Sequence, residues 1–154
     1  MSQQAPNTET LKFKIGLSGT YWDKRPDFTI WIDDTKYAAG TISMDSGVVE
    51  YMTFLADFIE GFEYSLKIRL ENKEQSDTLQ NEDCTEILKD MLLNIESIEI
   101  DDINLNQLKW TKSKFIPDDS ANRPLLENCI NLGWNGAYTL QFDTPFYLWL
   151  LENS

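Results

Sequence analysis

Hydrophobic and polar residues alternate along much of the chain, which is the period-two pattern of β-strands with one buried face. Apolar side chains occupy every second position at 11–17, 28–32 and 64–70, and the Asp33-Asp34 turn leads into a further segment at 36–42. Each segment ends in residues typical of turns. The pattern predicts half-buried strands in these four places.

The pattern is less regular elsewhere. Residues 48–58 are apolar at most positions of both parities, which predicts a strand covered on each side or interrupted by a bulge. A phase slip near Glu96 and Ser97 predicts a bulge within a strand at 91–100. Residues 105–115 favour a short hairpin or two short strands. The segments 71–86 and 116–128 are predicted loops, with one helical turn near 85–89.

The C-terminal part combines a turn signal with a change of period. Asn135-Gly136 lies between aromatic residues and predicts a hairpin within 132–142, because both residues tolerate positive φ. Thr144 is suited to cap a short helix with Pro145 at its first position. Eight or nine short strands and no long helical pattern predict an all-β fold, an antiparallel β-sandwich or jelly roll with a short C-terminal helix. We expect a flexible arm at 1–10 and one domain at 11–154.

Composition excludes several functions. The 154 residues include 13 Lys plus Arg, 26 Asp plus Glu and no His, for a net charge of -13. Such a surface repels phosphate backbones and anionic lipids, and we find no basic patch, so nucleic acid and membrane binding are not expected. The lack of histidine excludes His-dependent triads and His-metal sites. Gly-x-Ser-x-Gly and phosphate-loop motifs are also absent, so we predict that the protein is not an enzyme.

We expect no signal peptide, because the N-terminus is polar and has no apolar stretch. We also expect no membrane-spanning segment, because no apolar run approaches ~20 residues. Cys84 and Cys129 lie far apart without metal or redox spacing. We expect both to be reduced and buried, and a disulfide between them stays open as the alternative.

Acidic pairs and clusters are candidates for metal binding, at 33–34, 71–77, 101–102 and 118–119. Loop carboxylates at the edge of a sandwich are the hard oxygen ligands that Ca²⁺ prefers, although none has EF-hand spacing. The alternative is solvated surface charge, which an acid-rich chain clusters by chance. A glycosidase with paired carboxylates is a third hypothesis. It predicts turnover that is lost when either carboxylate is replaced.

Exposed aromatic rings are candidates for ligand contact, because sugar rings stack on Trp and Tyr faces. Trp31 points away from the apolar face of its predicted strand, Tyr21 and Trp22 lie in a loop, and Trp134 borders the predicted hairpin turn. We therefore predict these four residues as contacts for a glycan or a protein partner. The alternative is that they fill or cover the core.

Several short sequence motifs occur in a distinctive order. They are 19–22 (GTYW) with Pro26, 72–74 (NKE) with 77–78 (DT), 98–101 (IEID), 132–136 (LGWNG), and 144–147 (TPFY) followed by 149–151 (WLL). In this order the chain resembles small virion structural proteins of contractile-tailed phages that infect marine cyanobacteria, whose domains look like the β-sandwiches of carbohydrate-binding modules. The likeness spans nearly the whole chain after residue 10.

The resemblance implies a module displayed on a phage particle, with Asn72, Glu74 and Asp77 in a structured loop as candidate metal ligands. Members of this family carry a Tyr- and Trp-rich stretch before the last hairpin, whereas 116–128 has neither residue here. The resemblance further implies other virion proteins as partners, a homo-oligomer or multi-copy assembly, and synthesis in a host cytoplasm before mounting on the virion.

Two hypotheses for function follow. The first is a non-enzymatic virion structural protein in the tail, baseplate or capsid surface, which makes protein contacts and adheres to the host. The second is a carbohydrate-binding module that stacks sugars of a surface polysaccharide on Trp and Tyr, with no required cofactor or with Ca²⁺.

Overall fold

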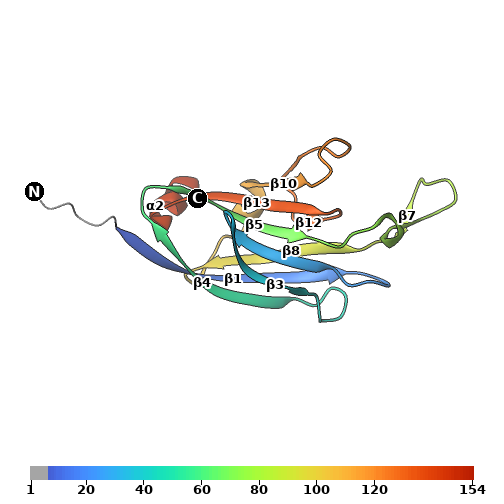
Figure 1. The fold of residues 1–154 in the computed structure, drawn as a ribbon, viewed down its shortest axis with the longest axis horizontal. Helices are drawn as coiled ribbons and strands as arrows, with labels where there is room; N and C mark the ends of the chain where they lie inside the picture. The colour runs from blue at the N-terminus through green and yellow to red at the C-terminus, as the bar shows by residue number, and fades with distance from the viewer. Residues whose placement is uncertain (1–6) are drawn as a thin grey trace, which may run out of the picture.

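The computed structural model describes residues 7–154, which form two antiparallel sheets packed as a β-sandwich (Figure 1). One sheet has the strand order β12-β8-β1-β4, with β9 added to β8, and the other has the order β11-β10-β13-β5-β2-β3. A separate ribbon, β6-β7, projects from one end. The elements are β1 (Thr8–Thr20), β2 (Asp27–Ile32), β3 (Thr35–Thr41), β4 (Glu50–Ile59), β5 (Glu63–Leu70), the 3₁₀ turn η1 (Gln75–Asp77), β6 (Leu79–Gln80), β7 (Ile87–Lys89), β8 (Leu92–Ile100), β9 (Ile103–Asn104), α1 (Leu108–Thr111), β10 (Ser113–Pro117), β11 (Leu126–Glu127), β12 (Asn131–Leu132), β13 (Gly136–Asp143) and α2 (Phe146–Asn153).

The two-residue alternation accounts for the core. In β1 the side chains of Leu11, Phe13, Ile15 and Leu17 are all buried, and the intervening lysines are half-buried. The alternating residues of β2 and β5 are buried in the same way, so the predicted strands at 11–17, 28–32 and 64–70 are confirmed. Both sheets contribute to one hydrophobic cluster. The predicted all-β sandwich with a short C-terminal helix is therefore confirmed.

An aromatic cluster joins α2 to the sandwich at the end away from the β6-β7 ribbon. The ring of Phe142 packs edge-on against Phe58, Phe146 and Trp149, with centroids 5.6, 6.4 and 6.4 Å away. These contacts bury Phe146 and Trp149 on one face of α2. Thr144 is not its cap, because its hydroxyl donates to the Ile59 carbonyl at 2.7 Å and Pro145 stands at the N-cap position.

The predicted Asn135-Gly136 hairpin is wrong. β12, before the turn, pairs with β8 in one sheet, whereas β13, after it, pairs with β10 and β5 in the other. The chain therefore crosses between the two sheets at this point. The Asn135 side chain pairs with the Lys73 backbone and so fixes the turn to a distant loop.

Strand β4 is an edge strand, and the prediction that it is covered on both sides is wrong. It pairs with β1 alone in a continuous register without a bulge, and every second residue from Tyr51 to Ile59 is exposed. Three of these five exposed residues, Tyr51, Leu55 and Ile59, are large and apolar, so the apolar residues on both parities reflect a partly apolar outer face of this strand. The bulge predicted near Glu96 is confirmed, because Gly16 lies opposite Ser97 and Leu17 opposite Ile95.

Several local predictions need correction. Ile87–Lys89 is the strand β7 and not a helical turn, because it pairs with β6. Residues 105–115 contain the helix α1 before the strand β10. Thr8–Thr10 pair with β4, so these three residues do not belong to a flexible arm, and residues 1–6 of the predicted arm lie outside the described residues. Within 7–154, no helix has the length and apolar character that crossing a bilayer requires.

Both cysteines are free. Cys84 is exposed in the loop between β6 and β7, and Cys129 is half-buried beside β12. The prediction that both are buried is therefore wrong for Cys84, because its loop projects beyond the core, and it holds only in part for the half-buried Cys129.

Candidate functional site

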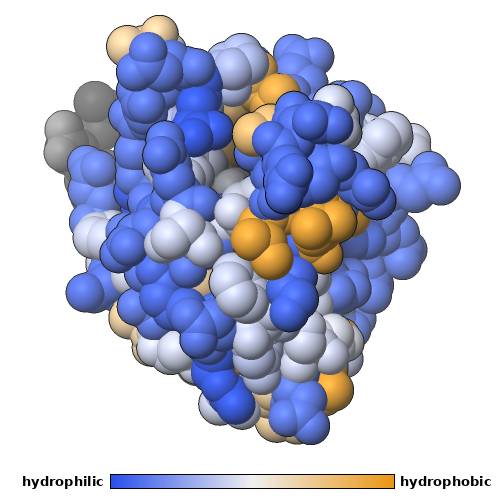
Figure 2. Space-filling view, turned by 90° about the vertical axis from the view of Figure 1, so that its right-hand side faces the viewer, coloured by the Kyte–Doolittle hydropathy of each residue, from blue (hydrophilic) through white to orange (hydrophobic). Residues whose placement is uncertain are grey.

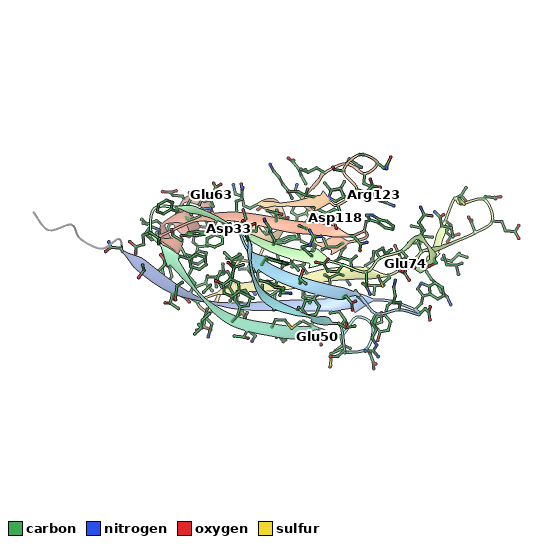
Figure 3. The ribbon with its side chains drawn as sticks, in the orientation of Figure 1. Asp33, Glu50, Glu63, Glu74, Asp118 and Arg123 are labelled. Carbon is green, nitrogen blue, oxygen red and sulfur yellow. The ribbon has the colours of Figure 1, made fainter. Side chains whose placement is uncertain are left out.

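Five loops gather at one end of the sandwich. β5 ends at Leu70, opposite Gly136 where β13 begins, and β1 ends at Thr20, opposite Leu92 where β8 begins. The loops at this end, which we call the loop end, are 21–26, 42–49, 71–91, 118–125 and 133–135 (Figure 1). In Figure 3, Glu74, Asp118 and Arg123 lie toward this end, whereas Asp33 and Glu63 lie toward the other. Six of the seven predicted site residues belong to these loops, and Trp31 does not.

A buried lysine anchors the longest of these loops. Lys73 is 3% exposed, and its ammonium donates to the Asp90 carboxylate and to the Met91 carbonyl. Burial of Asp90 opposes its charged form. Hydrogen bonds from the Lys73 ammonium, the Thr78 hydroxyl and the Met91 N–H outweigh this effect, so the pKa of Asp90 is lowered. Asp90 is therefore an ionised hydrogen-bond acceptor at neutral pH.

Asn135 connects the same loop to the 133–135 turn. Its Oδ1 accepts from the Lys73 N–H at 2.7 Å, and its Nδ2 donates to the Lys73 carbonyl at 2.9 Å. The amide thus imitates one rung of a β-ladder. Trp134 is held in place because its neighbour is bonded at both polar atoms.

Asp77, Glu74 and Trp22 meet around η1. Asp77 is buried, and its carboxylate accepts from the Glu74 N–H at 2.7 Å and from the Lys24 ammonium at 2.8 Å. Burial opposes the charge of Asp77, but these donors lower its pKa, and the same contact raises the pKa of Lys24. The Trp22 indole N–H donates to the Asp77 carbonyl at 2.9 Å.

The predicted metal ligands Asn72, Glu74 and Asp77 do not fit a calcium ion. The Asn72 Oδ1 accepts from the Asp27 N–H at 2.8 Å, and its amide donates to the Arg25 carbonyl at 3.0 Å, so it serves the backbone of the neighbouring loop. Lysine ammonium groups neutralise Asp77 and Asp90. Calcium needs six to eight oxygen ligands. Among residues 7–154, no group of three or more Asp, Glu, Cys or His side chains could hold a metal.

Two hollows, of about 570 and 250 Å³, share Arg123, Gly133 and Trp134 in their walls, and we call them together the groove. The larger hollow lies between the β6-β7 ribbon and the 133–135 turn, and the smaller one lies on the side of β10, β11 and β12. The remaining wall of the larger hollow is formed by Gln75, Thr78, Gln80, Ile87 and Asp90. The remaining wall of the smaller one is mainly apolar and is formed by Phe115, Pro124, Leu126, Cys129 and Asn131. Figure 2 views this end, where polar side chains dominate and apolar ones gather near the centre.

Two tryptophans at the loop end carry a cation over the ring. The Arg123 guanidinium carbon lies 3.9 Å from the centroid of the half-buried Trp134 ring. Trp22 is 41% exposed, and the Lys89 ammonium lies 5.3 Å from its ring. Trp134 is part of the wall of the groove. Trp22 is not, but its indole N–H is bonded to Asp77, whose neighbour Thr78 is in that wall.

Tyr21 and Trp31 contact other parts of the molecule. The Tyr21 hydroxyl donates to the Met44 carbonyl at 3.1 Å, so this ring supports the 42–49 loop. Trp31 faces away from the buried Phe28, Ile30 and Ile32, as predicted. It is half-buried on the outer face of its sheet, with the Lys36 ammonium 5.8 Å from its ring. Neither residue lines the groove.

Sequence reasoning missed Arg123, Asp90 and Thr78. Arg123 lies in a stretch interpreted as a surface loop, and its one signal is an isolated arginine in an acid-rich chain. Asp90 and Thr78 meet only because the ribbon folds back, with a hydrogen bond of 2.7 Å between their side chains. That contact has no counterpart in residue spacing.

Comparison with known proteins gives a likeness of fold. No family model and no curated protein matches the chain. Two solved structures match with a TM-score of 0.54. One is vCBM60 in complex with galactobiose, 9% identical, covering 84% of this chain and 96% of that one. The other is a SeMet form of vCBM60, from work on circular permutation between two families of calcium-dependent carbohydrate binding modules. It is 11% identical and covers 84% of this chain and 89% of that one.

At these identities the likeness is one of architecture. It confirms the part of the sequence resemblance that concerns fold, and it has no bearing on phage or cyanobacterial origin. The chain has the β-sandwich fold seen in carbohydrate-binding modules.

Proposed function

We propose that the protein is a non-catalytic carbohydrate-binding module whose saccharide occupies the groove at the loop end. The observation that carries this proposal is a groove with an aromatic wall at Trp134 and hydrogen-bonding side chains at Gln75, Thr78 and Gln80. Sugar C–H faces pack against aromatic rings, and sugar hydroxyls pair with amide, hydroxyl and carboxylate groups. A volume of about 570 Å³ lies within the range of roughly 300–1,000 Å³ for small-ligand sites.

The acid chemistry of the groove supports binding without catalysis. A glycosidase needs one carboxyl group with a raised pKa to protonate the leaving oxygen. Asp90, the carboxylate in the wall of the groove, instead has a lowered pKa because Lys73 and Thr78 donate to it. It is suited to accept a hydrogen bond from a sugar hydroxyl.

The fold comparison favours this function over display on a virion. A neighbour of similar architecture binds galactobiose, and we take galacto-configured oligosaccharides as the first probe. Particle display, virion partners and homo-oligomer assembly stay predictions from the sequence resemblance.

Calorimetric titration of the whole protein with neutral oligosaccharides of galacto, gluco and manno configuration tests the proposal. We expect saturable binding of at least one series with a stoichiometry near one. The proposal would be contradicted if the heat of titration did not exceed the heat of dilution for any of these neutral oligosaccharides or for their acidic counterparts.

Binding is expected to be independent of calcium. The ammonium groups of Lys24 and Lys73 occupy the positions beside Asp77 and Asp90 that a cation would take, so a calcium ion would have to displace an ion pair in which one partner is buried. The dissociation constant measured in excess EDTA should equal that in millimolar Ca²⁺. An affinity that falls in EDTA and recovers with Ca²⁺ would contradict the assignment of these two ion pairs.

A further inference from the structure

Arg123 differs from the other two arginines in its partners. Arg25 donates to the carbonyls of Ile42 and Ser43, and Arg69 donates to Glu71 and Asp118. The Arg123 guanidinium has no hydrogen bond or ion pair with any of residues 7–154, and its Nε is buried without a partner. A buried donor left without an acceptor is energetically unfavourable.

Three carboxylates near Arg123 are engaged elsewhere. Asp118 accepts from Arg69 at 2.7 and 2.9 Å, and Asp119 accepts from the Asn122 amide at 3.0 and 3.2 Å. Asp90, across the groove, accepts from Lys73 and Thr78. The positive charge of Arg123 is thus left without an ion-pair partner in a chain whose acids outnumber its bases two to one.

The position of Arg123 directs its donors toward a ligand. The guanidinium packs on the Trp134 ring at 3.9 Å, and both residues line both hollows of the groove. The Nε of Arg123 is buried, so a ligand in the groove would meet the two terminal nitrogens, whose donors lie in the plane of the guanidinium and form a fork that matches a carboxylate. Figure 3 shows Arg123 on the loop beyond β10, on the side of the β6-β7 ribbon.

We propose that the groove selects acidic saccharides, with Arg123 binding the carboxylate of a uronate residue through a two-pronged hydrogen bond. This inference rests on the proposed function and specifies its ligand class. The uronate ring packs beside Trp134, and Gln75, Thr78 and Gln80 bind its hydroxyls. Without such a local cation, the net charge of -13 would disfavour any anionic sugar.

The test compares matched sugar pairs by calorimetry. Galacto-, gluco- and manno-configured oligosaccharides are each offered in neutral form and as the uronate, which replaces the C6 hydroxymethyl group with a carboxylate. In at least one series we expect the uronate to bind about tenfold tighter or more than its neutral counterpart, the value of one charge-assisted hydrogen bond. A neutral sugar bound as tightly as its uronate in every series would overturn the inference and leave the proposed function intact. Failure of every sugar to bind would overturn both.

Variants separate a specific fork from general electrostatics. Arg123→Gln should reduce the ratio of uronate to neutral affinity to about one, and Arg123→Lys should restore only part of it, because an ammonium lacks the planar fork. Lys36→Gln is the matched control, because it removes one positive charge from another cation–tryptophan contact outside the groove. It should leave the ratio unchanged. Equal losses of preference in Arg123→Gln and Lys36→Gln, at unchanged melting temperatures, would overturn the inference.

Discussion

Replacing Asp90 with alanine should lower the free energy of unfolding by about 3–5 kcal/mol, because it leaves a buried ammonium without its counter-ion. The Lys73 side chain is 1% exposed, and its remaining acceptor is the Met91 carbonyl. Chemical denaturation of the purified variant measures the change. A loss of less than about 1 kcal/mol would show that Lys73 reaches water or another acceptor when Asp90 is removed.

Two variants distinguish charge burial from loss of packing. The double variant Lys73→Met with Asp90→Ala removes both charges, and we expect it to regain about 2 kcal/mol or more relative to Asp90→Ala. Asp102→Asn removes the charge that pairs with Lys12 in an exposed ion pair of 2.6 Å, and it should leave stability nearly unchanged, because asparagine also tolerates the positive φ of this position. A double variant no more stable than Asp90→Ala would contradict the electrostatic explanation.

The difference between wild type and Asp90→Ala should depend on pH. Because the pKa of Asp90 is lowered in the folded state, its contribution is complete above the ordinary value of about 3.9 and is lost as the pH falls through the folded value. The two unfolding free energies should therefore converge in strongly acidic solution. A difference that stays constant from neutral to acidic pH would contradict the ion pair.

Replacing Trp134 with alanine should weaken saccharide binding by about thirtyfold or more, equivalent to roughly 2 kcal/mol, because an aromatic anchor at the centre of a site carries much of the binding energy. The substitution removes the wall that both hollows share and the ring on which Arg123 packs. Calorimetric titration with the tightest-binding oligosaccharide measures the effect.

Trp31→Ala is the matched control for Trp134→Ala. Trp31 also carries a cation over its ring, but it lies on the outer face of its sheet. Its removal should leave affinity unchanged, and Trp134→Phe should retain part of the affinity because a smaller aromatic wall remains. Equal weakening by Trp31→Ala and Trp134→Ala would place the saccharide elsewhere.

The fold could be predicted to the extent that local alternation decides it. In β1 every second residue is apolar and buried, so sequence and structure agree. The hairpin predicted at Asn135-Gly136 is wrong because a tight-turn signal does not specify which sheet the following strand joins. The Asn135 side chain instead accepts a hydrogen bond from the Lys73 N–H. The prediction that 48–58 is covered on both sides is wrong because an edge strand with apolar residues on its outer face has the same sequence pattern as a strand buried on both sides.

Of the four predicted aromatic residues, Trp134 lines the groove, whereas the ion pairs around the groove could not be predicted. Trp22 and Trp134 were identified by residue type, and the loops bring them to the same end. The lysines that neutralise Asp77 and Asp90 could not be foreseen, because Lys24 and Asp77 are far apart in sequence and meet only in the folded chain. The acid cluster at 71–77 therefore suggested calcium ligands where the structure has ion pairs.

The most direct test of a saccharide site at the loop end is an NMR titration that follows the five tryptophan indole N–H signals during addition of the tightest-binding oligosaccharide. We expect the signals of Trp134 and Trp22 to shift with a common dissociation constant. Those of Trp31, Trp110 and Trp149 should stay in place. Shifts centred on Trp31 or Trp110, with Trp134 unchanged at saturation, would contradict the account.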